Sequence, residues 1–221
     1  MPRTDYQRQL RALRADVVEM GEVVLGRYDG ALTALATKNE DLAREIIDGD
    51  DAVNRRYLDL EGDCIDLFAL QQPVAGDLRF VASSFKIITD FERIGDLASN
   101  LAGYALDAER ERYPEVDIRH IGERTRSMVA DAIDAYDAAD AAAARSVARR
   151  DDDIDRLCET ASETVVEDLL RTNYGDESTA ILEDTSRLLL TVRDLERVAD
   201  HAVNVCARIV YTAEHDDELL Y

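Results

Sequence analysis

The sequence predicts an all-α protein built as two three-helix bundles in tandem, related by an internal pseudo-twofold repeat. Three observations predict it. The chain has only three prolines, Pro2, Pro73 and Pro114, and all lie outside its long periodic stretches. Within those stretches apolar residues recur every three or four positions, as in helices that bury one face. An eleven-residue acidic block is present twice, 104 residues apart in a chain of 221. Such a repeat indicates two copies of one supersecondary unit.

The first half is predicted to contain three long helices and a short one. The first long helix covers about residues 6–36, and its apolar stripe is Leu10, Leu13, Val17, Met20 and Val24. A turn at Lys38 and Asn39 leads into a short helix over 40–47, which Gly49 ends as a C-cap.

The second long helix is expected to start at Asp50 or Asp51 and to stop before Pro73. Its apolar stripe is Val53, Tyr57, Leu60, Cys64, Leu67 and Phe68. A third helix covers about 76–108, and the polar segment 109–116 is the predicted linker. We therefore place the first bundle at 1–112 and the second at 113–221.

The second half repeats this plan. Helices are predicted over about 118–138, 140–149, 151–171 and 178–211, with a loop at 173–177. The last helix follows the spacing of a bundle seam. Its seam residues are Leu188, Val192, Leu195, Ala199, Ala202, Cys206 and Ile209.

The charge balance excludes several classes of protein. The chain has 48 acidic against 26 basic residues, a net charge of -22. A protein that binds nucleic acid through charge needs a basic face, so we expect no nucleic-acid partner. No apolar run long enough to span a membrane and no apolar leader are present, which predicts a cytoplasmic protein. Only two basic residues are Lys, Lys38 and Lys86, a composition typical of a halophile, and we expect a halophilic archaeal host.

The repeated block carries the candidate site. Residues 90–100 match residues 194–204 at six of eleven positions. In each copy Glu, Asp and Asn stand four residues apart, so they lie along one side of a helix. Neighbouring carboxylates at this spacing repel, unless a cation neutralises them. The candidate ligands are Glu92, Asp96 and Asn100 in the first copy and Glu196, Asp200 and Asn204 in the second.

A second acidic set is expected to face each block. In an antiparallel hairpin, Asp50 and Asn54 fall level with residues 98 and 94, and Asp151 and Asp155 with residues 199 and 195. We therefore predict one cation site in each half. Oxygen ligands without Cys suit hard cations such as magnesium, calcium, manganese or iron. His201 points to another side of its helix, and Arg93 and Arg197 are expected to form salt bridges within the acidic faces.

These residues resemble the PhoU family. The block D-[FL]-E-R-[IV]-[GA]-D, present twice, and the segment Gln71-Gln72-Pro73-Val74-Ala75-Gly76-Asp77-Leu78-Arg79 carry the resemblance, which extends from about residue 5 to residue 211. It implies a fold of two three-helix bundles. It also implies a non-enzymatic negative regulator of phosphate uptake that contacts the ATP-hydrolysing subunit of the phosphate ABC transporter. A sensor kinase is a partner only where the host has one, and contact with the membrane is indirect, through the transporter.

The same resemblance implies a homodimer and metal, with iron favoured, at the E-x-x-x-D faces. Glu92, Asp96, Glu196 and Asp200 inherit this role first. Three alternatives stay open: a metal-dependent carboxylate-bundle enzyme, a regulator of a different phosphate transporter, and a helical scaffold whose acids serve salt adaptation alone. An enzyme is disfavoured because no candidate nucleophile and base stand out.

Overall fold

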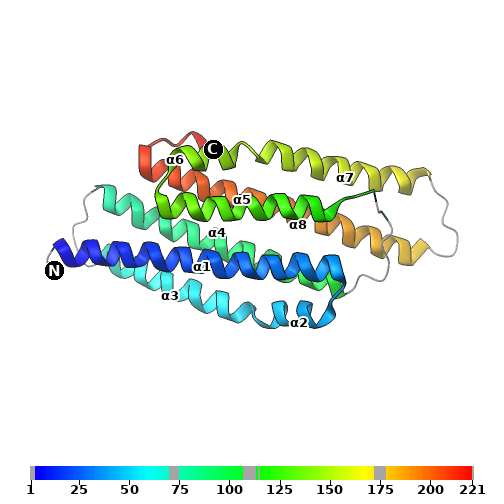
Figure 1. Ribbon diagram of the computed structural model, residues 1–221, viewed down its shortest axis with the longest axis horizontal. Helices are drawn as coiled ribbons and strands as arrows, with labels where there is room; N and C mark the ends of the chain where they lie inside the picture. Colours follow the sequence, from blue (N-terminus) through cyan, green and yellow to red (C-terminus); the bar gives the residue numbers. More distant parts are fainter. Residues whose placement is uncertain (1–2, 70–74, 107–112, 114, 172–177, 221) are drawn as a thin grey trace.

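The computed structural model describes residues 3–69, 75–106, 113, 115–171 and 178–220, and these residues form helices and no strand (Figure 1). The helices run side by side along the long axis of the molecule. In chain order they are α1 (Arg3–Thr37), α2 (Glu40–Asp48), α3 (Asp50–Ala69), α4 (Ala75–Leu106), α5 (Ile118–Ala138), α6 (Ala141–Ala148), α7 (Asp151–Arg171), α8 (Ser178–Glu214) and the 3-10 turn η2 (Glu218–Leu220).

Every predicted helix is present, and α5 and α7 have the predicted bounds. The two halves use the same turn chemistry. Lys38 after α1 and Ala139 after α5 adopt left-handed backbone angles, with φ of 53° and 52°. The next residues, Asn39 and Asp140, cap the short helices α2 and α6 with their side-chain oxygens. The predictions for Pro73, for most of the 109–116 linker and for the 173–177 loop lie outside the described residues.

The two repeats share one hydrophobic core. α4 packs against α8, and α1 packs against α5, so helices of different halves meet along the middle of the molecule. Phe91 and Leu195, which occupy the same position in the two acidic blocks, are both fully buried in this core. The predicted stripe of α1 and almost the whole seam of α8 are buried, and so are all three cysteines. Pairing between the repeats therefore positions the two acidic blocks.

One residue of the predicted apolar stripes is misplaced. Phe68 was assigned to the buried stripe of α3, but it is 37% exposed. Leu67 already points into the core at 4% exposure, and consecutive helical residues differ by about 100° in direction. Phe68 therefore projects from the side of the hairpin.

Polar contacts reinforce the junction between the halves. Arg14 of α1 donates to the carbonyl oxygens of Tyr136 and Asp137 at 2.8 and 2.9 Å, at the C-terminal end of α5. Its guanidinium also lies 5.0 Å from the ring centroid of Phe80 on α4. Arg14 thus links three helices. Across the described helices, no segment combines the length and hydropathy needed to cross a membrane.

Candidate metal-binding faces on a paired helix motif

The two acidic blocks lie on α4 and α8, which run antiparallel and join through their own motif residues. Asn204 Nδ2 donates to Asp90 Oδ1 at 3.2 Å, and His201 Nδ1 lies 2.9 Å from the same oxygen. At the other end of the pair, Asn100 Nδ2 donates to Asp194 Oδ2 at 3.5 Å. The first Asp of each block therefore binds the last Asn of the other block.

Asp194 is the most deeply buried of these groups. Its side chain is fully buried, and Tyr104 donates to its Oδ2 at 2.9 Å. Arg193 lies 2.8 Å and Arg197 lies 3.7 Å from its Oδ1. A buried carboxylate needs such partners because the charge has left water. The predicted ligands Asn100 and Asn204 thus contact the opposite helix, and the sequence pattern did not separate this pairing role from the acidic faces.

The face of the first half combines Glu92 and Asp96 of α4 with Asp50 of α3. Ser99 of α4 donates to Asp50 Oδ1 at 2.8 Å, next to the position predicted from the hairpin geometry. Asn54 Nδ2 also donates to Asp50, at 3.1 Å. The two predicted sets therefore meet in the first half.

Two arginines neutralise part of this first face. The Arg27 side chain, only 12% exposed, extends from α1 to lie 3.4 Å from Asp50 Oδ1. Arg93 pairs with Glu92 at 3.5 Å and with Asp96 at 3.4 Å, as predicted. Burial, followed by the neighbouring carboxylates, raises the pKa of both Glu92 and Asp96, and Arg93 opposes the rise.

In the face of the second half, no described arginine pairs with Asp151 as Arg27 pairs with Asp50. Burial raises the pKa of Asp151 to about 6, and the charges of Asp155, Asp200, Asp152 and Glu196 add to the rise. Asp151 Oδ1 is buried without a hydrogen-bond partner. α7 packs against α8, and the carboxylates of the two helices act on one another, in agreement with the hairpin geometry.

The other acids of this face experience the same field. Burial and then Asp155 raise the pKa of both Glu196 and Asp200. His201 and Arg197 counteract the effect at Asp200. A carboxylate whose charged form is disfavoured in this way is stabilised by any cation that binds beside it.

The difference between the faces has a simple origin in the repeat. The caps Asn39 and Asp140 are 101 residues apart, as are Asp50 and Asp151, the first residues of α3 and α7. The same offset relates Arg27 to Met128, an apolar residue that is fully buried. Alignment of the two halves on their caps is the sequence signal that would have found this asymmetry.

The side chains as placed do not form a ready coordination shell. In the described part of the chain, no three or more His, Cys, Asp or Glu side chains are grouped so that they could hold a metal ion. The donor chemistry nevertheless fits a hard cation, because both faces present carboxylate oxygens. The unpartnered oxygen of Asp151 makes the second face the better fit.

The remaining candidate groups lie elsewhere. His120 and His215 are exposed, as predicted. Burial raises the pKa of the Cys64, Cys158 and Cys206 thiols to about 12, so these thiols stay protonated. Neither the cysteines nor these two histidines contribute to an acidic face.

The fold and the paired blocks define a class of protein: two repeated helical bundles that share a core and each present an acidic face. The PhoU domain model matches residues 17–105 and 118–209, one match in each repeat. The chain belongs to the PhoU family.

Relatives match nearly the whole chain. A phosphate-specific transport system accessory protein PhoU homolog of Pseudomonas putida is 33% identical over 96% of this chain and 82% of its own. The homolog of Streptococcus pneumoniae serotype 4 is 33% identical over 95% of both chains. The PhoU protein of Escherichia coli K12 is 29% identical over 96% of this chain and 86% of its own.

Solved structures show the same fold. The crystal structure of PhoU from Pseudomonas aeruginosa superimposes with a TM-score of 0.88 at 31% identity, covering 96% of this chain and all of that one. The phosphate transport system regulatory protein PhoU from S. pneumoniae gives a TM-score of 0.87 at 29% identity, over 96% and 98% of the two chains. The two-bundle architecture predicted from the sequence is therefore confirmed.

Proposed function

We propose that this chain is a non-enzymatic accessory regulator of phosphate transport that works by binding other proteins. The observation that carries the proposal is similarity over nearly its full length, at 29–33% identity, to proteins named as accessory to phosphate-specific transport. The chemistry of the described residues agrees with a binding role. The thiols are buried and protonated. The groups whose negative charge is not fully neutralised by neighbours are carboxylates on two side faces.

We also propose whether this regulator raises or lowers phosphate uptake, and which protein it contacts. The chain acts as a negative regulator at the cytoplasmic side, as a homodimer that contacts the ATP-hydrolysing subunit of the phosphate ABC transporter. A sensor kinase is a further partner only in a host that has one. The support is the PhoU resemblance together with the similarity to the S. pneumoniae phosphate transport system regulatory protein PhoU.

Phosphate uptake measured in cells tests this function. Deletion of the gene is expected to raise uptake of labelled phosphate in phosphate-replete cells. A plasmid copy of the gene is expected to return uptake to the wild-type level. Co-purification with the ATP-hydrolysing subunit tests the partner. Unchanged uptake after deletion would overturn the proposal. A change confined to another phosphate transporter would instead support the alternative regulator considered above.

We further propose that the acidic faces bind metal, with iron favoured and manganese, magnesium or calcium as alternatives. The second face, formed by Asp151, Asp155, Glu196 and Asp200, is expected to bind first. Its support is the buried, unpartnered Asp151 oxygen and the absence of an arginine equivalent to Arg27 beside it. The first face, formed by Asp50, Asn54, Glu92 and Asp96, binds more weakly because Arg27, which has no counterpart on the second face, already supplies positive charge.

Elemental analysis by mass spectrometry tests the metal sites. The protein is purified in high salt without a metal-chelating tag, and wild type is compared with two matched pairs of substitutions. Glu196→Gln/Asp200→Asn is expected to lose most of the bound metal, and Glu92→Gln/Asp96→Asn to lose less. If wild type and both variants are equally empty after metal is added back, neither face is a metal site.

A further inference from the structure

Large apolar side chains are exposed at the two ends of the molecule. Of the eight such residues in the described part of the chain, six lie toward the α3–α4 or the α7–α8 hairpin ends. They are Ile65, Phe68 and Leu78 in the first half and Val166, Leu170 and Leu182 in the second. These helix ends lie at opposite ends of the long axis (Figure 1). Single exposed apolar residues are ordinary, but a cluster at one place suggests an interaction surface.

Two of these positions are repeated. The offset of 101 residues that relates α3 to α7 pairs Ile65 with Val166, which are 54% and 45% exposed. The offset of 104 residues that relates the acidic blocks of α4 and α8 pairs Leu78 with Leu182, at 43% and 59% exposed. Neither pair contributes to the core, so core packing does not explain why both halves keep an apolar residue there.

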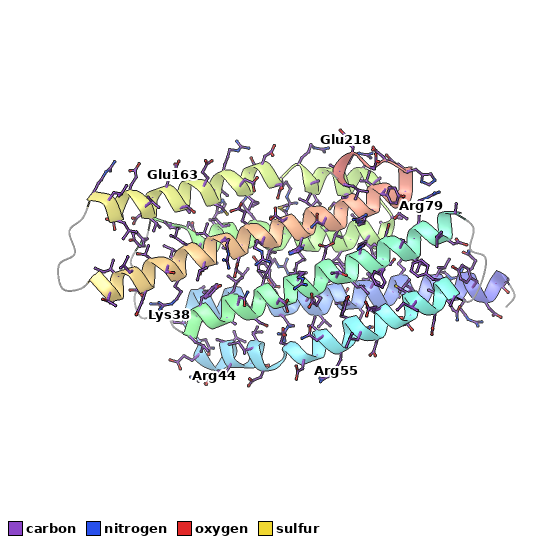
Figure 2. The ribbon with its side chains drawn as sticks, turned by 180° about the vertical axis from the view of Figure 1, so that it is seen from behind. Lys38, Arg44, Arg55, Arg79, Glu163 and Glu218 are labelled. Atoms are coloured by element: carbon purple, nitrogen blue, oxygen red, sulfur yellow. The ribbon has the colours of Figure 1, made fainter. Side chains whose placement is uncertain are left out.

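The surroundings of both clusters are mainly acidic, although Arg79 follows Leu78 and Arg171 follows Leu170. Residues 58–69 of α3 contain four acids and no Lys or Arg, and the equivalent residues 159–170 of α7 also contain four acids and no Lys or Arg. On α3, exposed Asp59, Asp63 and Asp66 alternate with the apolar side chains. On α7, Glu163 points outward from the bundle (Figure 2).

Exposed apolar side chains surrounded by acids favour a binding partner that carries positive charge. Another copy of the chain would bring acid against acid, and contacts at opposite ends would build an open chain of molecules. Nucleic acid and anionic lipid are repelled for the same reason. A protein segment that places apolar side chains between Lys or Arg residues is complementary on both counts.

We propose that the exposed apolar side chains near the C-terminal end of α3 and the N-terminal end of α4, and their counterparts on α7 and α8, form two equivalent docking surfaces for a basic amphipathic helix of a partner protein. The apolar side chains at Ile65 and Leu78, and at Val166 and Leu182, form the contact, and the surrounding acids select a basic partner. This inference goes beyond the regulatory function, because it does not depend on the partner being the transporter.

Binding of a designed peptide to the full chain tests the proposal. The probe is a fluorescent amphipathic helix with a leucine face bordered by lysines, followed by anisotropy and calorimetry in about 0.3 M KCl, where the Debye length is about 6 Å. Two control peptides keep one feature each: one replaces Lys by Glu, and the other replaces Leu by Ser. We expect two sites per chain for the probe and at least about tenfold weaker binding of either control.

Three variants separate docking from general attraction. Ile65→Asp/Val166→Asp is expected to abolish both sites, and Ile65→Asp alone to leave one. Val23→Asp adds the same charge at another exposed apolar residue, 48% exposed on α1, and is expected to bind like wild type. The proposal is overturned if wild type does not bind the probe, if the double variant binds it as wild type does, or if the serine peptide binds equally well. Helical circular dichroism checks that each variant is folded.

Discussion

His201 on α8 holds its Nδ1 atom 2.9 Å from Oδ1 of Asp90 on α4, and this contact joins the two copies of the acidic block. The equivalent acid of the other copy, Asp194, accepts instead from the Tyr104 hydroxyl at 2.9 Å. The first Asp of the block is therefore used to pair helices across the molecule. The Glu and the second Asp of each block remain for the side faces.

Two equivalent substitutions at the contact between α4 and α8 are expected to lower the free energy of unfolding by different amounts. Asp194→Asn removes a fully buried charge held by two arginines and a tyrosine, and should cost about 2 kcal/mol of unfolding free energy. Asp90→Asn changes a carboxylate that is 15% exposed and should cost about 1 kcal/mol. Urea denaturation measures both. Equal costs would contradict the view that burial of Asp194 dominates.

Equivalent substitutions in the two acidic faces are expected to change the stability of the protein in opposite directions. Asp50→Asn leaves the nearly buried Arg27 guanidinium without its carboxylate and should destabilise the protein by about 1–2 kcal/mol. Asp151→Asn removes a charge that burial and other acids disfavour, and should stabilise metal-free protein by on the order of 1 kcal/mol at pH 8. Thermal unfolding after chelation measures both. The same sign for both substitutions would show that the faces are electrostatically alike.

Asp151 also predicts a pH dependence. Its pKa in the folded state is about 6, above the ordinary value of 3.8, so the folded protein binds the proton more tightly than the unfolded chain does. The free energy of unfolding of metal-free protein should therefore fall as pH rises between about 4 and 6, and this contribution should be flat above that window. The slope in Asp151→Asn should be smaller. A slope identical to that of wild type would rule out Asp151 as its source.

Net charge predicts a dependence on salt. With a formal charge of -22, the folded state is destabilised by repulsion among its own charges, and added salt screens this repulsion. We expect the melting temperature to rise by about 5 °C when KCl is raised from about 0.1 M to about 1 M. Sucrose in place of KCl controls for general exclusion from the protein surface. A melting temperature that falls with KCl would contradict the prediction.

The helices could be predicted well because their signals are local. Periodic apolar residues identified the stripe of α1 and the seam of α8, and cap residues such as Asp140 mark where helices begin. The antiparallel hairpin geometry placed Asp50 level with residue 98, one residue from its observed partner Ser99. Phe68 shows the limit of such patterns, because a run of neighbouring apolar residues exceeds the width of the buried face.

By itself, the sequence determined the helical class, the twofold repeat, the acidic character of the motif and the family resemblance, since each depends on residue order along the chain. Only the tertiary structure decided which motif residues pair α4 with α8 and which remain on the faces. It also brought Arg27 to one face and left the buried Oδ1 atom of Asp151 on the other face without a hydrogen-bond partner. The reason is physical: charge compensation depends on distances between side chains of different helices, and packing of the two halves sets those distances.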